Sequence, residues 1–157
     1  KTILEPRAAA PAARIRVLRD LVEEGIPTGA VIAPIIPFIN DQELEHIVGE
    51  LSPTGISNIG YIVLRLPLEL EDLFRRWLQE HFPQRLERVM NRVRDLHGGN
   101  SYRSQWGERM KGVGVYSELL QNRFEKSLRR NGLDGCFFEP LRCDLFRNRG
   151  FEQIALF

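Results

Sequence analysis

Residues 29–41 read GAVIAPIIPFIND, and this stretch decides the fold class. The apolar run at 30–36 is typical of a strand that is buried on both faces, as in parallel sheets and barrels. Pro34 lies inside this run, and a proline cannot donate a hydrogen bond to a neighbouring strand. We therefore expect regular pairing to stop near Pro34, toward the carboxyl end of the strand. Ligands of α/β proteins bind at that end.

A helix is predicted on the amino-terminal side of this strand. Apolar residues recur at helical spacing within 15–22, and Pro11 suits the first turn of a helix. Gly25 and Pro27 prevent its continuation. Such a helix covers one side of a sheet and implies a further strand ahead of Lys1. Because the chain opens in a loop on a residue other than methionine, we expect it to be a fragment.

A second helix and a second strand follow. Asn40 and Glu43 have the spacing of a capping box, and the apolar stripe at 44–51 predicts the helix that they begin. The run IGYIVLRL at 59–66 predicts another buried strand, which Pro67 ends. Strand, helix and strand form a βαβ unit with parallel strands and a right-handed crossover.

The rest of the chain is predicted to be helical and then irregular. Apolar stripes predict three more helices, which end at 82–83, at 98–99 and near 131. We therefore expect an α/β part at 1–67, a helical extension at 68–132 and an irregular tail at 133–157.

The charge of the chain is balanced overall but unevenly distributed. There are 22 Lys and Arg against 21 Asp and Glu in 157 residues, a net charge of +1. Residues 85–130, however, carry 11 basic and 5 acidic side chains. This segment combines cations with aromatic rings, as surfaces that bind nucleic acid do. The candidate residues are Tyr102, Arg103, Trp106, Arg109 and Lys111, with Tyr116 nearby. The alternative is a charged helical face above core aromatics.

No motif of catalysis or metal binding is present in the sequence. Cys136 and Cys143 give neither a zinc spacing nor a disulfide framework, which favours the reducing cytoplasm. His46, His81 and His97 are far from one another in sequence, and solvated positions are expected for all three. No stretch has the composition of a membrane span or a signal peptide. Catalytic residues therefore cannot be named from motifs.

Three charged residues lie near predicted strand ends. Glu5 and Arg7 flank a proline in a loop that should follow a strand ahead of Lys1, and such loops form the active face of a barrel. An ordinary exposed loop is the alternative. Arg65 interrupts the second apolar strand close to its carboxyl end. It faces either a barrel mouth or a solvated edge, and if buried it needs an anionic or polar partner.

Several motifs together resemble the second half of a radical SAM protein. They are LEPRAAAPAAR at 4–14 and LRDLVEEGIPTGAVIAPIIPFIND at 18–41, followed by YIVLRLPLEL and GGNSYRSQWGERMKGVGVY. The group they resemble is related to spore photoproduct lyase and is called DNA repair photolyase-like. In that group a Glu-Pro loop leads into a helix and then into a strand similar to 31–41 here.

This resemblance implies the C-terminal part of a partial (β/α)6 radical SAM barrel, with two buried parallel strands and their covering helices, plus a helical extension. It also implies binding of S-adenosylmethionine and a 4Fe-4S cluster, and radical chemistry of a lyase-like, DNA-repair kind. The cofactor-binding residues that it implies are Glu5, Arg7, Ala33, Pro34, Ile35, Leu64, Arg65 and Leu66.

The chain departs from the family pattern at two points. The CxxxCxxC loop that holds the cluster is absent, and Cys136 and Cys143 cannot replace it. The cluster ligands are therefore expected in a missing N-terminal part, and this chain alone should be inactive. In addition, Phe38 stands where the family usually has glycine, which would narrow the approach of the backbone to the cofactor.

The last five residues, QIALF at 153–157, resemble the peptide by which bacterial DNA-processing proteins bind the sliding clamp. Gln153 would make polar contacts while Leu156 and Phe157 fill an apolar pocket of the clamp. A terminal segment that folds back on the core is the alternative.

The sequence thus predicts an α/β protein and two main functions. The first is a fragment of a radical SAM enzyme that acts on nucleic acid, with DNA and the sliding clamp as partners and no membrane association. The second is a non-catalytic α/β module that binds nucleic acid or the clamp. A protein or small-molecule substrate is the third possibility.

Overall fold

The computed structural model describes residues 3–102 and 104–133. In this part the fold is α/β, with a two-stranded parallel sheet and five α-helices. The helices and strands are α1 (Pro11–Glu23), β1 (Gly29–Ile35), α2 (Leu44–Leu51), β2 (Asn58–Val63), α3 (Leu70–His81), α4 (Leu86–Leu96) and α5 (Val115–Arg130). Short 3-10 helices, η1 (Asp41–Glu43), η2 (Ser52–Thr54) and η3 (Pro83–Arg85), lie beside α2 and before α4. The predicted βαβ unit and the predicted helices are confirmed.

Pro34 lies at an irregularity of the sheet. The strands pair in register from Gly29 opposite Asn58 to Ile32 opposite Tyr61, but the next pair is Ile35 opposite Val63. Three steps along β1 therefore face two steps along β2, as in a bulge. The extra residue removes Pro34, whose preceding peptide bond is cis, from the regular hydrogen-bond ladder. Regular pairing ends there, as predicted.

The second strand is shorter than the sequence predicted. β2 ends at Val63 rather than at Leu66. The amide of Val63 donates to the carbonyl of Met110 at 2.9 Å, and the amide of Leu64 donates to the carbonyl of Ile35 at 2.9 Å.

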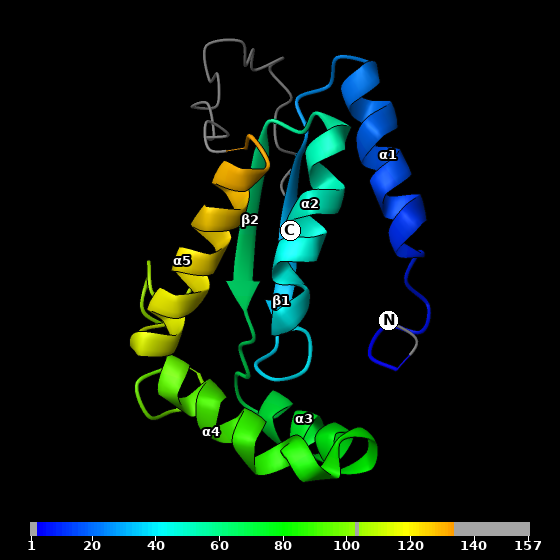
Figure 1. Cartoon of the computed structure of the whole chain (residues 1–157). Helices are drawn as coiled ribbons and strands as arrows, with labels where there is room; N and C mark the ends of the chain where they lie inside the picture. Colours follow the sequence, from blue (N-terminus) through cyan, green and yellow to red (C-terminus); the bar gives the residue numbers. More distant parts are fainter. Residues whose placement is uncertain (1–2, 103, 134–157) are drawn as a thin grey trace, which may run out of the picture.

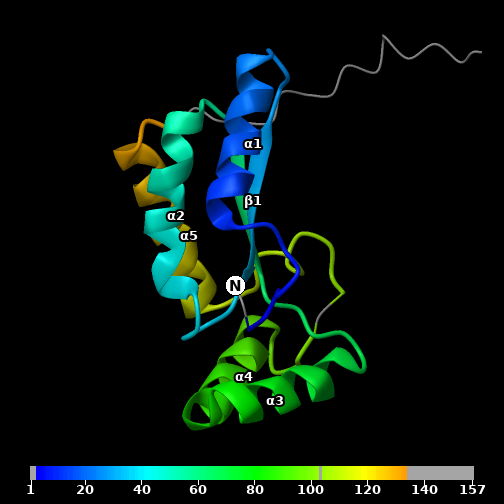
Figure 2. The same cartoon turned by 90° about the vertical axis from the view of Figure 1, so that its right-hand side faces the viewer.

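The two faces of the sheet differ, which corrects the prediction that both strands are buried on both faces. α2 and α5 lie over one face, with α1 beside α2 (Figures 1 and 2). On the other face Val31 is 58% exposed, and Ala33 is exposed as well. A continuous apolar run predicts two covered faces, but the described chain supplies helices for one. Among the described residues β1 also has β2 as its single strand neighbour.

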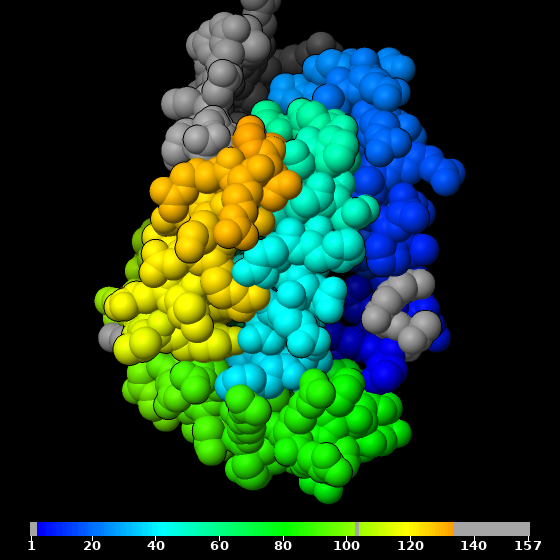
Figure 3. All heavy atoms as spheres, in the orientation of Figure 1, coloured from blue at the N-terminus to red at the C-terminus, as the bar shows by residue number. Residues whose placement is uncertain are grey.

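Two apolar cores share the described chain. The first joins the covered face of the sheet to α2 and α5, with side chains of α1 packed against it. The second joins α3 and α4 to Ile36, Leu64 and Leu66, which lie beyond the strand ends. The neighbours Ile35 and Ile36 belong to different cores, so the two cores meet at the carboxyl end of β1. In Figure 3 the segment of α3 and α4 accordingly forms one end of the molecule, below α5, α2 and α1.

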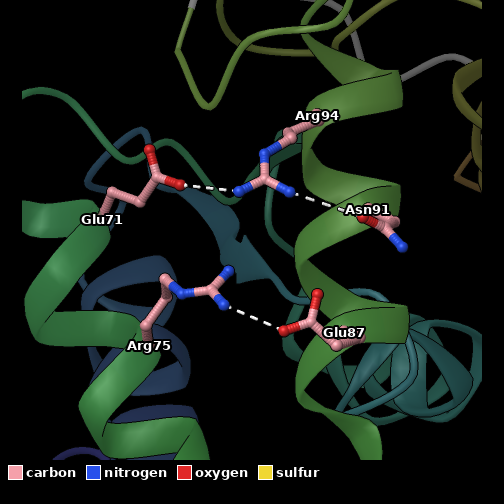
Figure 4. A network of polar contacts seen from close by, with 5 residues as sticks. All are labelled: Glu71, Arg75, Glu87, Asn91 and Arg94. Atoms are coloured by element: carbon pink, nitrogen blue, oxygen red, sulfur yellow. Dashed lines mark hydrogen bonds and ion pairs between the residues drawn. The ribbon is translucent and has the colours of Figure 1, made fainter.

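Ion pairs join α3 to α4 on their exposed sides (Figure 4). Arg94 donates to the carboxylate of Glu71 at 3.1 Å, and Arg75 donates to that of Glu87 at 2.9 Å. The same Arg94 lies 3.4 Å from the side-chain oxygen of Asn91. Pairs this exposed contribute at most about 1 kcal/mol each, so the apolar core between the two helices is the main stabilising contact. No helix of the described ranges has both the length and the apolarity needed to cross a bilayer.

Candidate functional site

The carboxyl ends of β1 and β2 form the first candidate site. A buried histidine fixes their backbone: Nε2 of His97 donates to the carbonyl of Leu64 at 2.9 Å, and the side chain is 1% exposed. The expectation of a solvated His97 was therefore wrong, because the turn after α4 returns toward the end of β2. His46 and His81 are exposed, as expected.

The cofactor residues implied by the resemblance divide into buried and accessible ones. Ile35, Leu64 and Leu66 are buried in the two cores, so a ligand at this end would meet their backbone rather than their side chains. Ala33 is exposed on the uncovered face of the sheet, and Arg65 is half-buried beyond the end of β2. The structure brings these two segments, 33–35 and 64–66, together at one end of the sheet, with Pro34 between Ala33 and Ile35.

The predicted loop of Glu5 and Arg7 lies at the same end of the sheet. The segment ahead of α1 is level with the carboxyl ends of the strands in both views (Figures 1 and 2). Both side chains are exposed, and the carboxylate of Glu5 accepts a hydrogen bond from Arg14 at 3.0 Å. Arg7 is thus an exposed residue of a segment that lies level with the carboxyl ends of β1 and β2.

The loop after β1 is held by Asn40. The sequence predicted that Asn40 would cap the next helix, but its side chain bonds to the loop instead. Its Nδ2 donates to the carbonyl of Pro34 at 3.0 Å, and its Oδ1 accepts from the amide of Ile36 at 2.7 Å. The segment that follows is the 3-10 helix η1, so α2 begins only at Leu44. Within this loop Phe38 has a φ of 61°, in the left-handed region that favours glycine.

The loop at 98–114 forms the second candidate site and packs along the free edge of β2. The carbonyl of Met110 accepts from Val63, and the amide of Val113 donates to the carbonyl of Leu96 at 2.9 Å. Gly112, at φ 77°, lies so close to α4 that a Cβ there would be 2.9 Å from a methyl group of Leu96. The loop is therefore fixed at its carboxyl-terminal half.

Two of the five predicted nucleic-acid residues come together in this loop. Trp106 is 83% exposed, and the guanidinium carbon of Arg109 lies 4.6 Å from the centroid of its indole ring. Lys111 is exposed but lies near the ring of Tyr61, at 5.9 Å, and Tyr102 is half-buried. Arg103 lies outside the described residues.

The residues predicted to be important in the tail also lie outside the described residues. They are Gln153, Leu156 and Phe157 of the clamp peptide, together with Cys136 and Cys143. They stay predictions. Within the described ranges, no three His, Cys, Asp or Glu side chains are grouped so as to hold a metal ion. These ranges therefore do not supply the ligands of a 4Fe-4S cluster.

A third site, which the sequence did not predict, is a pocket of about 330 Å³ beside the loop that follows β1. It is lined by Phe38, Asp41, Gln42, Arg85, Arg88 and Arg123. The regular spacing of Arg85, at the end of η3, and of Arg88 and Arg92 on α4 is the signal that could have indicated it. The loop and α5 reach this side of α4 only through tertiary packing, which no local pattern reveals.

Two half-buried polar pairs each contribute one residue to the lining of this pocket, Asp41 from one pair and Arg123 from the other. The hydroxyl of Tyr116 donates to the carboxylate of Asp41 at 2.5 Å. Burial, and then this bond, raise the pKa of Tyr116 well above its usual range, so the phenol stays a donor. Arg123 donates to both carboxylate oxygens of Glu45 at 2.7 Å, and its hydrogen bond lowers the pKa of Glu45.

Known proteins resemble only part of this chain. Over 93 residues, 59% of the chain, it is 34% identical to the uncharacterized protein MJ0683 of Methanocaldococcus jannaschii, and the match covers 34% of that protein. Over 63 residues, 37% of the chain, it is 40% identical to the uncharacterized protein ORF301 of Acidianus two-tailed virus, of which the match covers 21%. No family model and no solved structure matches the chain. The chain thus spans about a third or less of the length of these relatives.

Proposed function

We propose that this chain is the C-terminal part of a radical SAM enzyme of the photolyase-like group, with nucleic acid as its substrate class. The observation that carries the proposal is the parallel pair of β1 and β2, whose carboxyl ends lie at the same end of the sheet as the loop of Glu5 and Arg7. Three separate sequence segments that the resemblance assigns to one cofactor therefore lie at the same end of the sheet.

The uncovered face of the sheet supports this proposal. Its residues on the two strands are small or apolar, with Ala33 on β1 and Gly60 on β2, where a Cβ would meet no atom within 4 Å. A barrel interior next to a flat cofactor needs such room. The backbone at Ile35 and Leu64 would border the adenine, and Glu5, Arg7 and Arg65 would supply charged groups around the polar end. S-adenosylmethionine, bound together with a 4Fe-4S cluster, supplies radical hydrogen abstraction in this family.

The part of the proposed site on this chain has a binding role. Nothing in the described ranges fits the cluster, whose ligands would come from a CxxxCxxC loop ahead of Lys1. The protein groups at the strand ends would hold and orient the cofactor and exclude water from it. His97 would act as a positioning residue, since it fixes the carbonyl of Leu64.

The test uses the full-length protein that contains this chain. It is reconstituted anaerobically with iron and sulfide, reduced, and mixed with S-adenosylmethionine, and 5′-deoxyadenosine is measured by chromatography. We expect turnover-dependent release of 5′-deoxyadenosine. A correctly folded, iron-loaded protein that releases none would refute the proposal, as would a coding sequence without CxxxCxxC ahead of Lys1.

A matched pair of arginine variants locates the cofactor. Arg65→Gln at the end of β2 should weaken binding of S-adenosylmethionine about tenfold, measured by equilibrium dialysis, because it removes a half-buried cation at the proposed site. Arg76→Gln, on the exposed side of α3, should leave binding unchanged. Equal affinities for the two variants would place the cofactor elsewhere.

The second candidate function is nucleic-acid binding without catalysis, and Trp106 favours it. An 83% exposed tryptophan with a guanidinium 4.6 Å above its ring offers a flat surface on which a base can stack. Trp106→Ala should weaken binding of single-stranded DNA about five- to fiftyfold in a fluorescence anisotropy titration. Trp106→Phe should keep most of the affinity, and an equal loss in both variants would argue against stacking.

A further inference from the structure

The pocket between the loop after β1, α4 and α5 is not part of either proposed site. Its lining comes from segments that meet in the lower half of Figure 3, where the surfaces of the loop, of α4 and of α5 come together. Its volume of about 330 Å³ is large enough for a small polar ligand. Three guanidinium groups, of Arg85, Arg88 and Arg123, line it against the single carboxylate of Asp41.

One of these cations is already neutralised. Arg123 donates to both oxygens of Glu45 and, at 2.9 Å, to the backbone carbonyl of Asp41. The carboxylate of Asp41 accepts from Tyr116, and burial keeps this phenol protonated. Asp41 and Arg123 therefore already have partners within the chain and are fixed parts of the lining.

The other two cations are not neutralised by a carboxylate. Arg85 donates to the carbonyl of Phe38 at 2.8 Å, and the guanidinium carbon of Arg88 lies 3.9 Å from the centroid of the Phe38 ring. Within the described ranges, neither arginine forms an ion pair with Asp or Glu. A guanidinium has five N–H donors, so each of these keeps donors for a further partner.

Phe38 orients these arginines. Its φ of 61° is rare for a residue with a side chain, and it places the aromatic ring against α4. Arg88 lies over this ring, and Arg92 lies 5.6 Å from the same centroid and 4.9 Å from that of Tyr116. The ring attracts each cation without accepting its in-plane N–H groups, so it restricts the guanidinium groups and leaves their donors available.

Arg85, at the end of η3, forms a row with Arg88 and Arg92 of α4. Arg85, Arg88 and Arg92 are spaced three and four residues apart, which corresponds to about 4.5 and 6 Å along a helix axis. The opposite side of α4 is buried through Leu86, Val89, Met90 and Val93. The row is therefore held in place by the core beneath it.

We propose that this pocket binds a phosphate group, presented either by a nucleotide or by the backbone of a nucleic acid. The two guanidinium groups have no carboxylate partner and together carry two positive charges and several N–H donors. A phosphate, with its higher charge and larger number of oxygens, matches them better than a carboxylate does. The proposal does not depend on cofactor binding at the strand ends.

The experiment titrates the chain with inorganic phosphate, adenosine monophosphate and a single-stranded oligonucleotide, and follows the arginine Nε–H signals by NMR. We expect the signals of Arg85 and Arg88 to shift with saturation. An affinity for the oligonucleotide that falls steeply with salt and exceeds that for the nucleotide identifies backbone phosphate as the source. Equal affinities identify the free nucleotide.

Three variants distinguish specific binding in the pocket from nonspecific attraction by positive charge. Arg88→Gln should weaken binding at least tenfold, and Arg88→Lys should recover part of the affinity, since it restores the charge without the fork of donors. Arg76→Gln removes an exposed arginine from α3 and should leave the affinity unchanged. Circular dichroism and thermal melting establish that each variant is folded. The proposal is overturned if no ligand shifts the Arg85 and Arg88 signals, or if Arg88→Gln and Arg76→Gln bind equally.

Discussion

Tyr61 and Tyr116 are both buried tyrosines on the same core, yet their hydroxyl groups are in opposite situations. Tyr116 donates to Asp41, whereas the hydroxyl of Tyr61 has no hydrogen-bond partner among the described residues. Burial, followed by the charge of Glu125, raises the pKa of Tyr61. We expect Tyr116→Phe to lower the free energy of unfolding by about 2 kcal/mol, because the carboxylate of Asp41 loses its donor.

Tyr61→Phe is the matched variant. It removes a buried hydroxyl that makes no hydrogen bond, so the free energy of unfolding should stay the same or rise by up to about 1 kcal/mol. Urea unfolding at pH 7 measures both variants. A loss in Tyr61→Phe as large as that in Tyr116→Phe would show that Tyr61 has a partner.

Gly112 and Gly107 test how closely the 98–114 loop approaches α4. Both have positive φ values, 77° and 88°, so an alanine at either position is strained by about 1 kcal/mol. A Cβ at Gly112 would in addition lie 2.9 Å from Leu96, whereas one at Gly107 would meet no atom within 4 Å. Gly112→Ala should therefore lower the free energy of unfolding by about 2–4 kcal/mol, and Gly107→Ala should lower it by about 1 kcal/mol, as measured by thermal unfolding. Similar costs would contradict this packing.

At the scale of elements, the connection from β1 to α2 depends on one side chain. Asn40 bonds to the backbone on both sides of Ile35, at Pro34 and Ile36, and so fixes where the strand ends. Asn40→Ala should lower the free energy of unfolding by about 2 kcal/mol, since two backbone groups lose their partner. Asn122→Ala, on the exposed side of α5, is the control and should change it by less than about 0.5 kcal/mol. Equal effects in denaturant unfolding would remove Asn40 from this role.

Local sequence patterns predicted most of the elements correctly. The stripe of α4 and the proline and glycine boundaries of α1 are properties of consecutive residues, and the structure confirms them. The prediction that β1 is buried on both faces was wrong, because burial depends on which other segments cover a strand. The predicted capping role of Asn40 was wrong for a related reason. An asparagine side chain can either cap a helix or bond to the backbone of a loop, and here η1 follows Asn40 while its side chain bonds to the loop.

The candidate sites were predictable only where their residues are close together in the sequence. Trp106 and Arg109 are three residues apart, so their pairing in one loop could be anticipated from the sequence. The pocket joins Phe38 to Arg88 and Arg123, which are distant along the chain. Only the packing of α5 and α4 against the loop after β1 brings them together. The side chain of His97 was misjudged likewise, because its partner Leu64 lies on another element.

At the scale of the whole molecule, two carboxylates connect distant elements and make stability depend on pH. A hydrogen bond from Arg123 lowers the pKa of Glu45, and hydrogen bonds from Ser101 and then Arg94 lower that of Glu71. A carboxyl with a lower pKa in the folded state stabilises it above the unfolded pKa, near 4.5. This contribution is lost as the pH falls through the folded pKa. We expect the free energy of unfolding to decrease between pH 5 and pH 3, as urea titrations would measure.

The double variant Glu45→Gln, Glu71→Gln should be less stable at pH 7 by about 1 kcal/mol, a modest value because both groups are partly exposed. Its stability should then decline less steeply toward pH 3 than that of the parent chain. Glu80→Gln on the exposed side of α3 is the control. If the stability of the double variant declined as steeply toward pH 3 as that of the parent chain, Glu45 and Glu71 would not be the source of the pH dependence.

The outer edge of β1 has a practical consequence for handling the protein. Among the residues that the structure describes, no other strand pairs with this edge, so its backbone donors and acceptors beside the exposed Val31 are a template on which another copy can add a strand. Natural sheets protect such edges with charges. Expressed as this segment, the chain should self-associate in a concentration-dependent manner that light scattering detects. Val31→Lys should act as a gatekeeper and keep the same chain monodisperse at higher concentration.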